Sequence, residues 1–387
     1  MAEATNPGFG LYIHWPFCQS KCPYCDFNSH VAEKVDQKRW QAAFEAELER
    51  TSRETRGQIL ESVFFGGGTP SLMDPDLVAA IMDKVRSSWR MSNAPEITLE
   101  ANPGSVEAGR FAAYRQAGVN RVSIGVQSLD DTALRMLGRK HSVQEAIRAV
   151  EIAQTTFPRF SFDIIYARQG QDRADWRREL DRALALGSRH LSLYQLTIEE
   201  GTVFHERNRR GLLTGMPDED LAADLYLLTQ ERCDAAGLPA YEVSNHAAPG
   251  EESRHNLTYW RGGDYVGIGP GAHGRVTQNG IRLATEAPRQ PSVWLEAVET
   301  RGFGELPRQA LTGAEVASEY CLMGLRLTDG ISLGRYQSLT GHGFDPQRVE
   351  NLVSIGLLEA NSERIWATKS GMLVLNLILR DILLPVS

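Results

Sequence analysis

Long hydrophobic runs and an excess of positive charge are both missing from this chain of 387 residues. No segment approaches the run of about 18 apolar residues that spans a membrane, and Met1 to Gly10 show no basic stretch followed by an apolar one. The formal net charge is -8, whereas nucleic acids and anionic membrane surfaces attract clustered positive charge. We therefore expect a cytoplasmic protein with no signal peptide, no transmembrane segment and no nucleic-acid partner.

Cysteine is also scarce, but three of the five cysteines fall within eight residues as C-x3-C-x2-C: Cys18, Cys22 and Cys25. Three is an odd number, and the spacing is too tight for an ordinary disulfide framework. A structural zinc ion takes four protein ligands, usually as two separated pairs, and here only His14 or His30 could serve as the fourth. Iron–sulfur clusters bind cysteine thiolates, and three of them leave one iron of a four-iron cluster open to a small molecule. An iron–sulfur cluster is therefore favoured over zinc.

Short apolar runs alternate with amphipathic stretches from residue 9 to about residue 197. Trp40, Phe44 and Leu48 recur at the spacing of one helix face, and three later stretches show similar patterns. Such alternation predicts βαβ units and a parallel sheet, either a partial barrel or an open doubly wound sheet. The two remaining cysteines, Cys233 and Cys321, lie in helical patterns and are expected to be small buried hydrophobic residues. The predicted strands are 9–14, 60–65, 96–101, 119–126, 159–166 and 189–196.

Polar and glycine-rich motifs recur where the predicted strands end, which in a barrel is the end that builds the site. Consecutive glycines let the backbone approach a ligand closely, and a carboxylate within an apolar strand needs a partner or a ligand. Each motif alone could be a turn or a helix cap, but their joint recurrence at strand ends indicates a binding site. The motifs are Gly66-Gly-Gly-Thr69, Glu100-Ala-Asn102-Pro103, Ser123 to Gln127, Leu137-Gly-Arg139, and Asp163 within the fifth strand.

The cysteine motif, with Tyr24 before its third cysteine, resembles the signature of the radical S-adenosylmethionine (SAM) family, and the whole set resembles its coproporphyrinogen-oxidase-like branch. The resemblance implies a [4Fe-4S] cluster on Cys18, Cys22 and Cys25, with SAM on the open iron. Reduction of such a cluster cleaves SAM to a 5′-deoxyadenosyl radical. The resemblance also implies an α/β fold, a partial (β/α)6 TIM-like barrel.

By the same resemblance, nine residues are expected to contact SAM. Physically, Glu100 suits a ribose hydroxyl or an ammonium group, and the planar fork of Arg139 suits a carboxylate. One departure from the family pattern is Ala167-Arg168-Gln169-Gly170, where relatives more often have Gly-Leu-Pro-Gly. The implied SAM contacts are Tyr12, Tyr24, Gly67, Gly68, Thr69, Glu100, Gln127, Arg139 and Asp163.

The chain divides into three expected parts. Residues 1–240 form the barrel with the cluster and SAM site, and residues 306–387 resemble a small winged-helix-like α+β domain with a scaffold or lid role. Residues 241–305 between them are rich in His, Tyr and Gly, which suggests a ligand-facing connection rather than core. This connection contains His255-Asn-x-x-Tyr259-Trp260, a motif associated with heme in the heme chaperones of the branch.

Two functions compete within this branch: an oxygen-independent coproporphyrinogen III oxidase, and a heme chaperone related to it. The oxidase signature has a further Cys two residues after the third, where this chain has Phe27, and a long segment ahead of the cluster, where this chain has 17 residues. A neutral imidazole is a good axial ligand for heme iron, which makes His255 the expected heme ligand. We therefore expect the chaperone, with heme as its cargo and no coproporphyrinogen oxidase activity. A radical SAM enzyme with an unrelated substrate is the third hypothesis.

The chaperone hypothesis implies its partners. Heme-accepting proteins, respiratory ones among them, would receive the heme, in transient contact with partners at a membrane. A homodimer is a further implied assembly.

Overall fold

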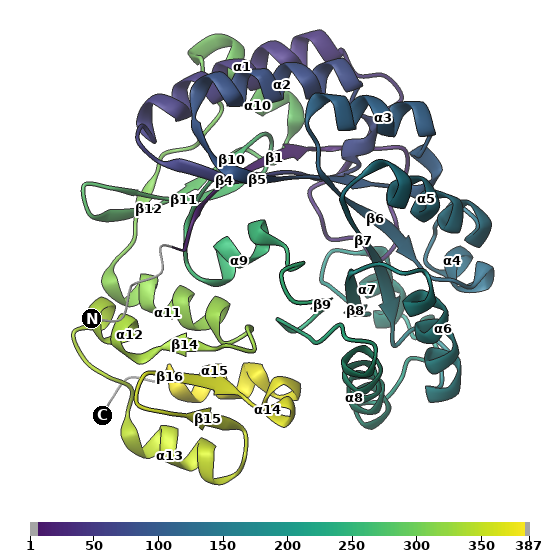
Figure 1. Ribbon diagram of the computed structural model, residues 1–387, viewed down its shortest axis with the longest axis vertical. Helices are drawn as coiled ribbons and strands as arrows, with labels where there is room; N and C mark the ends of the chain where they lie inside the picture. The colour runs from purple at the N-terminus through teal and green to yellow at the C-terminus, as the bar shows by residue number, and fades with distance from the viewer. Residues whose placement is uncertain (1–6, 384–387) are drawn as a thin grey trace.

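A computed structural model describes residues 7–383, and its largest feature is one curved sheet (Figure 1). The sheet ends at β9 on one side and at β13 on the other, so it is an open, partial barrel. All six predicted strands are present, although β5 begins at Arg90 rather than at residue 96. They lie side by side in sequence order and are parallel: β1 Phe9–Trp15, β4 Ile59–Gly67, β5 Arg90–Ala101, β6 Arg121–Gln127, β7 Arg159–Tyr166 and β8 His190–Gln195.

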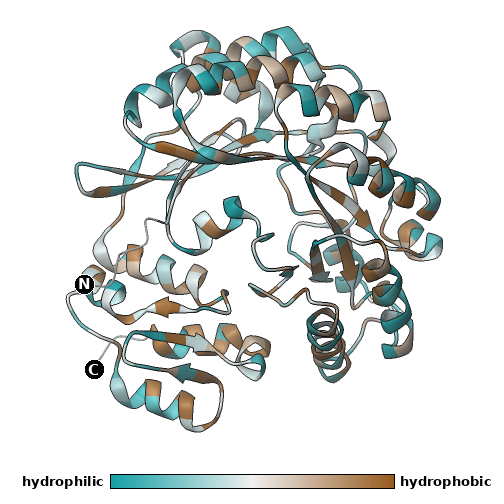
Figure 2. Ribbon diagram, viewed as in Figure 1, coloured by the Kyte–Doolittle hydropathy of each residue, from teal (hydrophilic) through white to brown (hydrophobic). Residues whose placement is uncertain are grey.

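Helices follow the outer, convex side of the sheet (Figure 1). The predicted stripe Trp40, Phe44 and Leu48 is buried on α1, and the strands of the sheet carry many hydrophobic residues, which are brown in Figure 2. Helix α5 begins at a capping box in which the Ser142 and Glu145 side chains each bond the other's backbone N–H. The covering helices are α1 Gln37–Glu54, α2 Pro75–Ser88, α3 Ala108–Ala117, α4 Asp131–Met136, α5 Val143–Thr156, α6 Arg173–Ala185 and α8 Glu219–Ala235.

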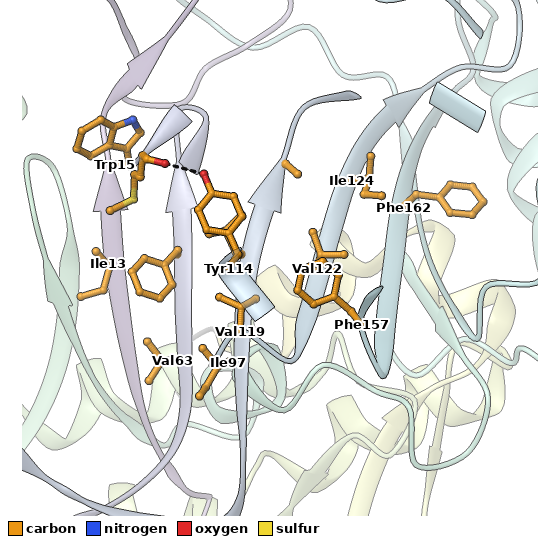
Figure 3. Packing of buried hydrophobic residues seen from close by; sticks show 14 of the residues in the cluster. Ile13, Trp15, Val63, Ile97, Tyr114, Val119, Val122, Ile124, Phe157 and Phe162 are labelled. Carbon is orange, nitrogen blue, oxygen red and sulfur yellow. Dashed lines mark hydrogen bonds between the residues drawn. The ribbon is translucent and has the colours of Figure 1, made fainter. Parts of the chain in front are cut away.

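The core between strands and helices is made of aliphatic and aromatic side chains from neighbouring strands (Figure 3). Ile13, Val63 and Val122 are fully buried, and each such side chain contributes about 1.5–3 kcal/mol through burial. The Tyr114 hydroxyl from α3 donates to the Met73 carbonyl oxygen at 2.6 Å, which satisfies the one polar group of that ring inside the core. This packing holds the strand ends, and therefore the loops after them, in fixed positions.

Residues 241–305 are not the connection outside the core that the sequence analysis expected. Strand β9 (Asn245–Ala247) pairs with β8 at one edge of the sheet, and β10 (Asp264–Ile268) lies parallel to β1 at the other. Gly267 of β10 also lets the start of β11 approach closely, since a Cβ there would lie 2.1 Å from the His273 carbonyl oxygen. The remaining elements are α9 Arg254–Trp260, β11 His273–Gln278, β12 Ile281–Glu286, α10 Pro291–Arg301 and β13 Gln309–Ala310.

Helix α9 lies on the concave side of the sheet, between it and the C-terminal domain (Figure 1). Short elements follow the carboxyl ends of β1, β4, β5 and β8, which is the end of the sheet that carries the cysteine loop. They are β2 Phe17–Cys18, β3 His30–Val31, the 3-10 turns Pro70–Leu72 and Pro103–Ser105, and α7 Val203–Arg209.

The C-terminal part has a hydrophobic core of its own, which includes Cys321, and the element order of a winged helix. Both ends of the chain, at residues 1 and 387, lie outside the described residues, and the domain boundaries near 240 and 305 stay predictions. Among residues 7–383, no helix is long and apolar enough to cross a membrane. The elements are α11 Gly313–Gly324, β14 Ile331–Ser332, α12 Leu333–Thr340, α13 Pro346–Ser354, β15 Leu358–Ala360, β16 Arg364–Ala367, α14 Lys369–Leu373 and α15 Leu375–Ile382.

Candidate functional site

The cysteine loop leaves the carboxyl end of β1 and is held from several sides. The backbone N–H of Gly68 donates to the Trp15 carbonyl oxygen at 2.7 Å, and that of Thr69 donates to the Phe17 carbonyl oxygen at 2.8 Å. On the other side, the N–H of Phe204 donates to the Pro23 carbonyl oxygen at 2.9 Å. These bonds join the loop to the glycine motif and to α7, so the three half-buried cysteines sit on a backbone with a defined shape.

Hydrogen-bond donors surround the three sulfur atoms. The Thr69 hydroxyl donates to Cys18 Sγ at 3.2 Å, and Arg139 Nη1 donates to Cys22 Sγ at 3.5 Å. The Ser29 hydroxyl is buried without a partner at normal hydrogen-bond geometry in the described part of the chain, yet it lies close enough to Cys18 and Cys25 to lower the pKa of both thiols. Burial is the larger effect and raises both pKa values. Donors aimed at sulfur are what thiolate ligands of an iron–sulfur cluster require.

A single-ion site is a poor description of this loop. No three His, Cys, Asp or Glu side chains within residues 7–383 come together in an arrangement that could hold one metal ion. A zinc ion would need its ligands within about 2.3 Å of one point, whereas a four-iron cluster takes each thiolate on a different iron. His14 is no fourth ligand either, because its ring bonds Tyr12 and Asn28. The donor set therefore fits the predicted cluster better than zinc.

The glycine motif after β4 needs its glycines. Gly67 has a φ of +110°, and a Cβ there would lie 2.6 Å from the His14 ring, while a Cβ on Gly68 would lie 2.7 Å from the Phe17 carbonyl oxygen. The N–H of Gly67 donates to the Glu100 carboxylate at 3.2 Å. The motif thus brings the cysteine loop and the end of β5 together.

Two carboxylates, Glu100 and Asp163, face the interior of the barrel. Burial and the nearby Asp163 raise the pKa of Glu100 to about 8, and burial raises the pKa of Asp163 to about 6, although the Ser123 hydroxyl donates to Asp163 at 3.1 Å. Two acids in one low-dielectric space favour a cationic ligand, which would let both ionise. SAM carries a sulfonium and an ammonium group, so this pair fits the molecule that the sequence implied.

The remaining predicted SAM contacts lie around the same opening. The Arg139 guanidinium donates to the Gly125 carbonyl oxygen at 3.0 Å and lies beside Tyr24, and its Nε has no partner among the described residues. Gln127 adopts a φ of +66°, which strains a residue other than glycine. The Tyr12 hydroxyl donates to His14 Nδ1 at 3.0 Å, because His14 Nε2 must donate to the Asn28 carbonyl oxygen at 2.9 Å.

His255 lies below this opening, where its ring stacks on Phe64 and its centroid is 6.4 Å from the ring of Tyr12, one of the predicted SAM contacts. It lies beside Gly10, five residues before Trp15 along β1, which is about 16 Å of strand. Its Nδ1 bonds the Ser62 hydroxyl at 2.8 Å, its Nε2 bonds the Tyr259 hydroxyl, and its side chain is buried. Burial lowers the pKa of His255 to about 3, so the imidazole is neutral. Both ring nitrogens are occupied, and in this arrangement neither is available to iron.

Sequence reasoning missed Ser29 and Asn28, and it considered His14 only as a possible zinc ligand and not as the partner of Tyr12 and Asn28. Asn28 donates from its side chain to the carbonyl oxygens of Pro270 at 2.9 Å and Arg289 at 3.0 Å, which ties the cysteine loop to segments more than 240 residues away in the sequence. No local pattern marks these residues. Their only signal is their place just before the cysteine motif, for His14, or just after it, for Asn28 and Ser29.

Comparisons with known proteins identify the family of the chain. The Radical SAM superfamily pattern matches residues 12–183, and the HemN C-terminal domain pattern matches residues 311–374. The chain is 39% identical over 389 residues to "Radical S-adenosyl methionine domain-containing protein 1, mitochondrial" of Bos taurus, with 96% of this chain and 87% of that protein covered. It is 37% identical over 378 residues to "Heme chaperone HemW" of Escherichia coli (strain K12), with 96% and 97% covered. The chain belongs to the radical SAM superfamily, in the branch that contains the HemW proteins.

A solved structure confirms the fold. Coproporphyrinogen III oxidase (HemN) from Escherichia coli, described as a radical SAM enzyme, matches with a TM-score of 0.81 and 20% identity, over 98% of this chain and 91% of that chain. At this identity the match concerns the fold alone. The radical SAM barrel with a small C-terminal domain is thus confirmed for this chain.

Proposed function

We propose that this protein is a heme chaperone that carries a [4Fe-4S] cluster on Cys18, Cys22 and Cys25 and binds SAM beside it. The observation that carries the cofactor site is the set of donors around the three sulfurs next to two carboxylates that favour a cation. The heme function is supported by similarity over nearly the full length to proteins named heme chaperone HemW.

The residues of the barrel opening divide the work of holding SAM. Glu100 and Asp163 would neutralise its positive charges, and Arg139, through its free Nε, would hold a carboxylate. The cluster would supply an open iron and one electron to the bound SAM. Gln127, Tyr12 and Tyr24 would form the walls of the pocket.

Two positions for the heme are compared: a cavity beside α9, and His255 as the iron ligand. Space for a flat ligand lies on the opposite face of α9 from His255: a cavity of about 610 Å³ beside Arg254, Leu257 and Arg261, with the C-terminal domain on its far side. Ligand pockets commonly measure about 300–1,000 Å³. Iron ligation by His255 would require the Tyr259 hydroxyl to leave Nε2 and α9 to turn, whereas a heme in the cavity would leave α9 in place.

The test is an anaerobic heme titration of the reconstituted protein that follows the Soret band, beside His255→Ala, Tyr259→Phe and Leu257→Trp. The proposal expects saturable binding near one heme per chain in the wild type. If His255 holds the iron, Tyr259→Phe tightens binding and His255→Ala weakens it. If the cavity holds the heme, Leu257→Trp fills it and weakens binding, while His255→Ala has little effect. The absence of saturable binding in all four proteins would refute heme carriage.

A coproporphyrinogen oxidase is the second candidate, because HemN shares the fold. Against it stands Phe27, which is exposed beside the cluster loop where the oxidase signature has a further cysteine. Protoporphyrinogen formation from coproporphyrinogen, SAM and a reductant would establish the oxidase instead. Restoring cysteine at Phe27 is not expected to create this activity.

We further propose heme-accepting proteins as partners, reached in the cytoplasm and in part at membranes, and a homodimer. The support is the HemW similarity, since those proteins are named chaperones. Size-exclusion chromatography of the reconstituted protein with and without heme tests the dimer.

A further inference from the structure

Two hydroxyl groups, those of Thr69 and Ser29, make no hydrogen bond to the backbone of the described residues, unlike most hydroxyls in loops. Thr69 stands at the first position before the 3-10 turn Pro70–Leu72, where a threonine usually caps the backbone, but its hydroxyl makes no cap bond. It donates to Cys18 Sγ at 3.2 Å instead. The loop itself does not need this bond, because the backbone N–H of Thr69 already holds Phe17 at 2.8 Å.

Ser29 approaches the same sulfur from the other end of the cysteine loop. Its side chain is 7% exposed, and its hydroxyl has no partner at normal hydrogen-bond geometry within residues 7–383. A buried hydroxyl without a partner costs about 1–3 kcal/mol, so its position needs a compensating contact. Ser29 follows Cys25 by four residues, and its hydroxyl lowers the pKa of the Cys18 and Cys25 thiols. A thiolate that carries cluster charge would accept this hydrogen bond.

We propose that Thr69 and Ser29 donate hydrogen bonds to the cluster thiolates, chiefly Cys18, and thereby set how readily the cluster is reduced. Reduction adds one electron and no proton to the cluster, and no bond is formed or broken. The reduced cluster carries more negative charge on its sulfurs, so donors stabilise it more than the oxidised cluster and raise its reduction potential. Thr69, expected from the sequence to contact SAM, is on this account a positioning and tuning residue of the cluster.

This inference rests on the proposed function, because it requires a cluster on Cys18. The experiment reconstitutes wild type, Thr69→Val, Thr69→Ser and Ser29→Ala anaerobically and titrates each with titanium(III) citrate. The electron paramagnetic resonance (EPR) signal of the reduced cluster is recorded without SAM, so that effects on SAM binding do not enter. Valine has the shape of threonine without its donor, and serine keeps the donor, which makes the pair a matched control.

At the midpoint potential of the wild type, Thr69→Val and Ser29→Ala should each show about a fivefold lower ratio of reduced to oxidised cluster, as expected for one hydrogen bond of about 1 kcal/mol. Thr69→Ser should match the wild type. Wild-type potentials in both Thr69→Val and Ser29→Ala, with full iron content, would overturn the inference and leave the proposed cluster intact. A wild type that retains no iron or sulfide would refute the proposed function itself. If Thr69→Val does not fold, Ser29→Ala carries the test alone.

Discussion

The two ends of the barrel carry equally suggestive sequence motifs but opposite local chemistry. At the opening, the Ser29 hydroxyl and Arg139 Nε lack partners in the described chain, and burial together with the nearby Asp163 raises the pKa of Glu100 to about 8. At the floor, which is the end of the barrel where α9 lies, the histidine of the HNxxYW motif is satisfied: His255 bonds Ser62 and Tyr259, and its backbone N–H donates to Glu96 at 3.2 Å. Trp260 Nε1 of the same motif has no hydrogen-bond partner within residues 7–383. The difference between the two ends lies in the groups that the motifs single out, since His255 has both ring nitrogens satisfied whereas the Ser29 hydroxyl and Arg139 Nε do not have partners in the described chain.

Removal of a cluster ligand should have the largest effect at the opening. Cys22→Ala should abolish the visible absorption of the reconstituted cluster, because two thiolates do not retain a four-iron cluster. The measurement is iron and sulfide per chain together with the absorption spectrum under anaerobic conditions. Cys233→Ala, at a buried cysteine of α8, is the control and should keep the cluster. Unchanged iron content in Cys22→Ala would show that the ligand assignment is wrong.

Substitutions at the floor should change the free energy of unfolding rather than the cofactor content. Arg159 donates to Glu96 at 2.6 Å and to Glu251 at 2.8 Å, and Glu96 is fully buried. Arg159→Ala leaves Glu96 without its cation and should lower the free energy of unfolding by about 3 kcal/mol. Denaturant unfolding measures this loss.

Its control is Arg178→Ala, which removes an exposed ion pair with Asp175 and should change the stability by less than about 0.5 kcal/mol. Iron per folded chain should be equal in the wild type, Arg159→Ala and Arg178→Ala. Loss of the cluster in Arg159→Ala while the chain stays folded would contradict the division between floor and opening.

Protonation of Glu100 should make SAM binding depend on pH. Burial and Asp163 hold the pKa of Glu100 near 8, so below that pH the carboxyl is neutral and must lose its proton to pair with a cation. The affinity for SAM should therefore rise between about pH 6 and pH 8, by at most about tenfold per pH unit, with proton release on binding. Calorimetry of the reconstituted protein in buffers of different ionisation enthalpy measures both effects.

Glu100→Gln should bind SAM about tenfold more weakly at pH 8.5 and lose much of this pH dependence. Glu96→Gln on the floor should keep it. A wild type whose SAM affinity falls with rising pH would contradict the assignment of Glu100.

The smallest expected effect concerns the departure from the family pattern after β7. Ala167 has a φ of +55°, the conformation that a glycine adopts without strain. Ala167→Gly removes a penalty of about 1–2 kcal/mol but adds unfolded-state entropy, so we expect a gain in unfolding free energy of about 0.5 kcal/mol. Thermal unfolding against the wild type checks the sign, and a clear loss of stability would show that Ala167 is not strained.

The sequence was a good guide where local pattern decides structure. Apolar runs located the six strands, and polar groups at their ends do come together, since the Gly67 N–H donates to Glu100 and Asp163 lies close enough to raise the pKa of Glu100. The sequence could not give the surroundings of His255, because partners 193 and 159 residues away, Ser62 and Glu96, fix the orientation of α9. The assignment of His255 as heme ligand stays a prediction. The sequence did not predict a role for Ser29 for the same reason, because only the folded loop brings its hydroxyl close enough to affect Cys18 and Cys25.

The most direct test of the difference between the two ends is an EPR spectrum of the reduced, reconstituted cluster with and without SAM. The wild type, Glu100→Gln and His255→Ala are compared. If SAM binds beside Glu100 and the cluster, SAM should change the spectrum of the wild type and of His255→Ala alike. The change should be much weaker in Glu100→Gln. A wild-type spectrum that SAM leaves unchanged, or a change that depends on His255 and not on Glu100, would contradict the placement of SAM at the opening.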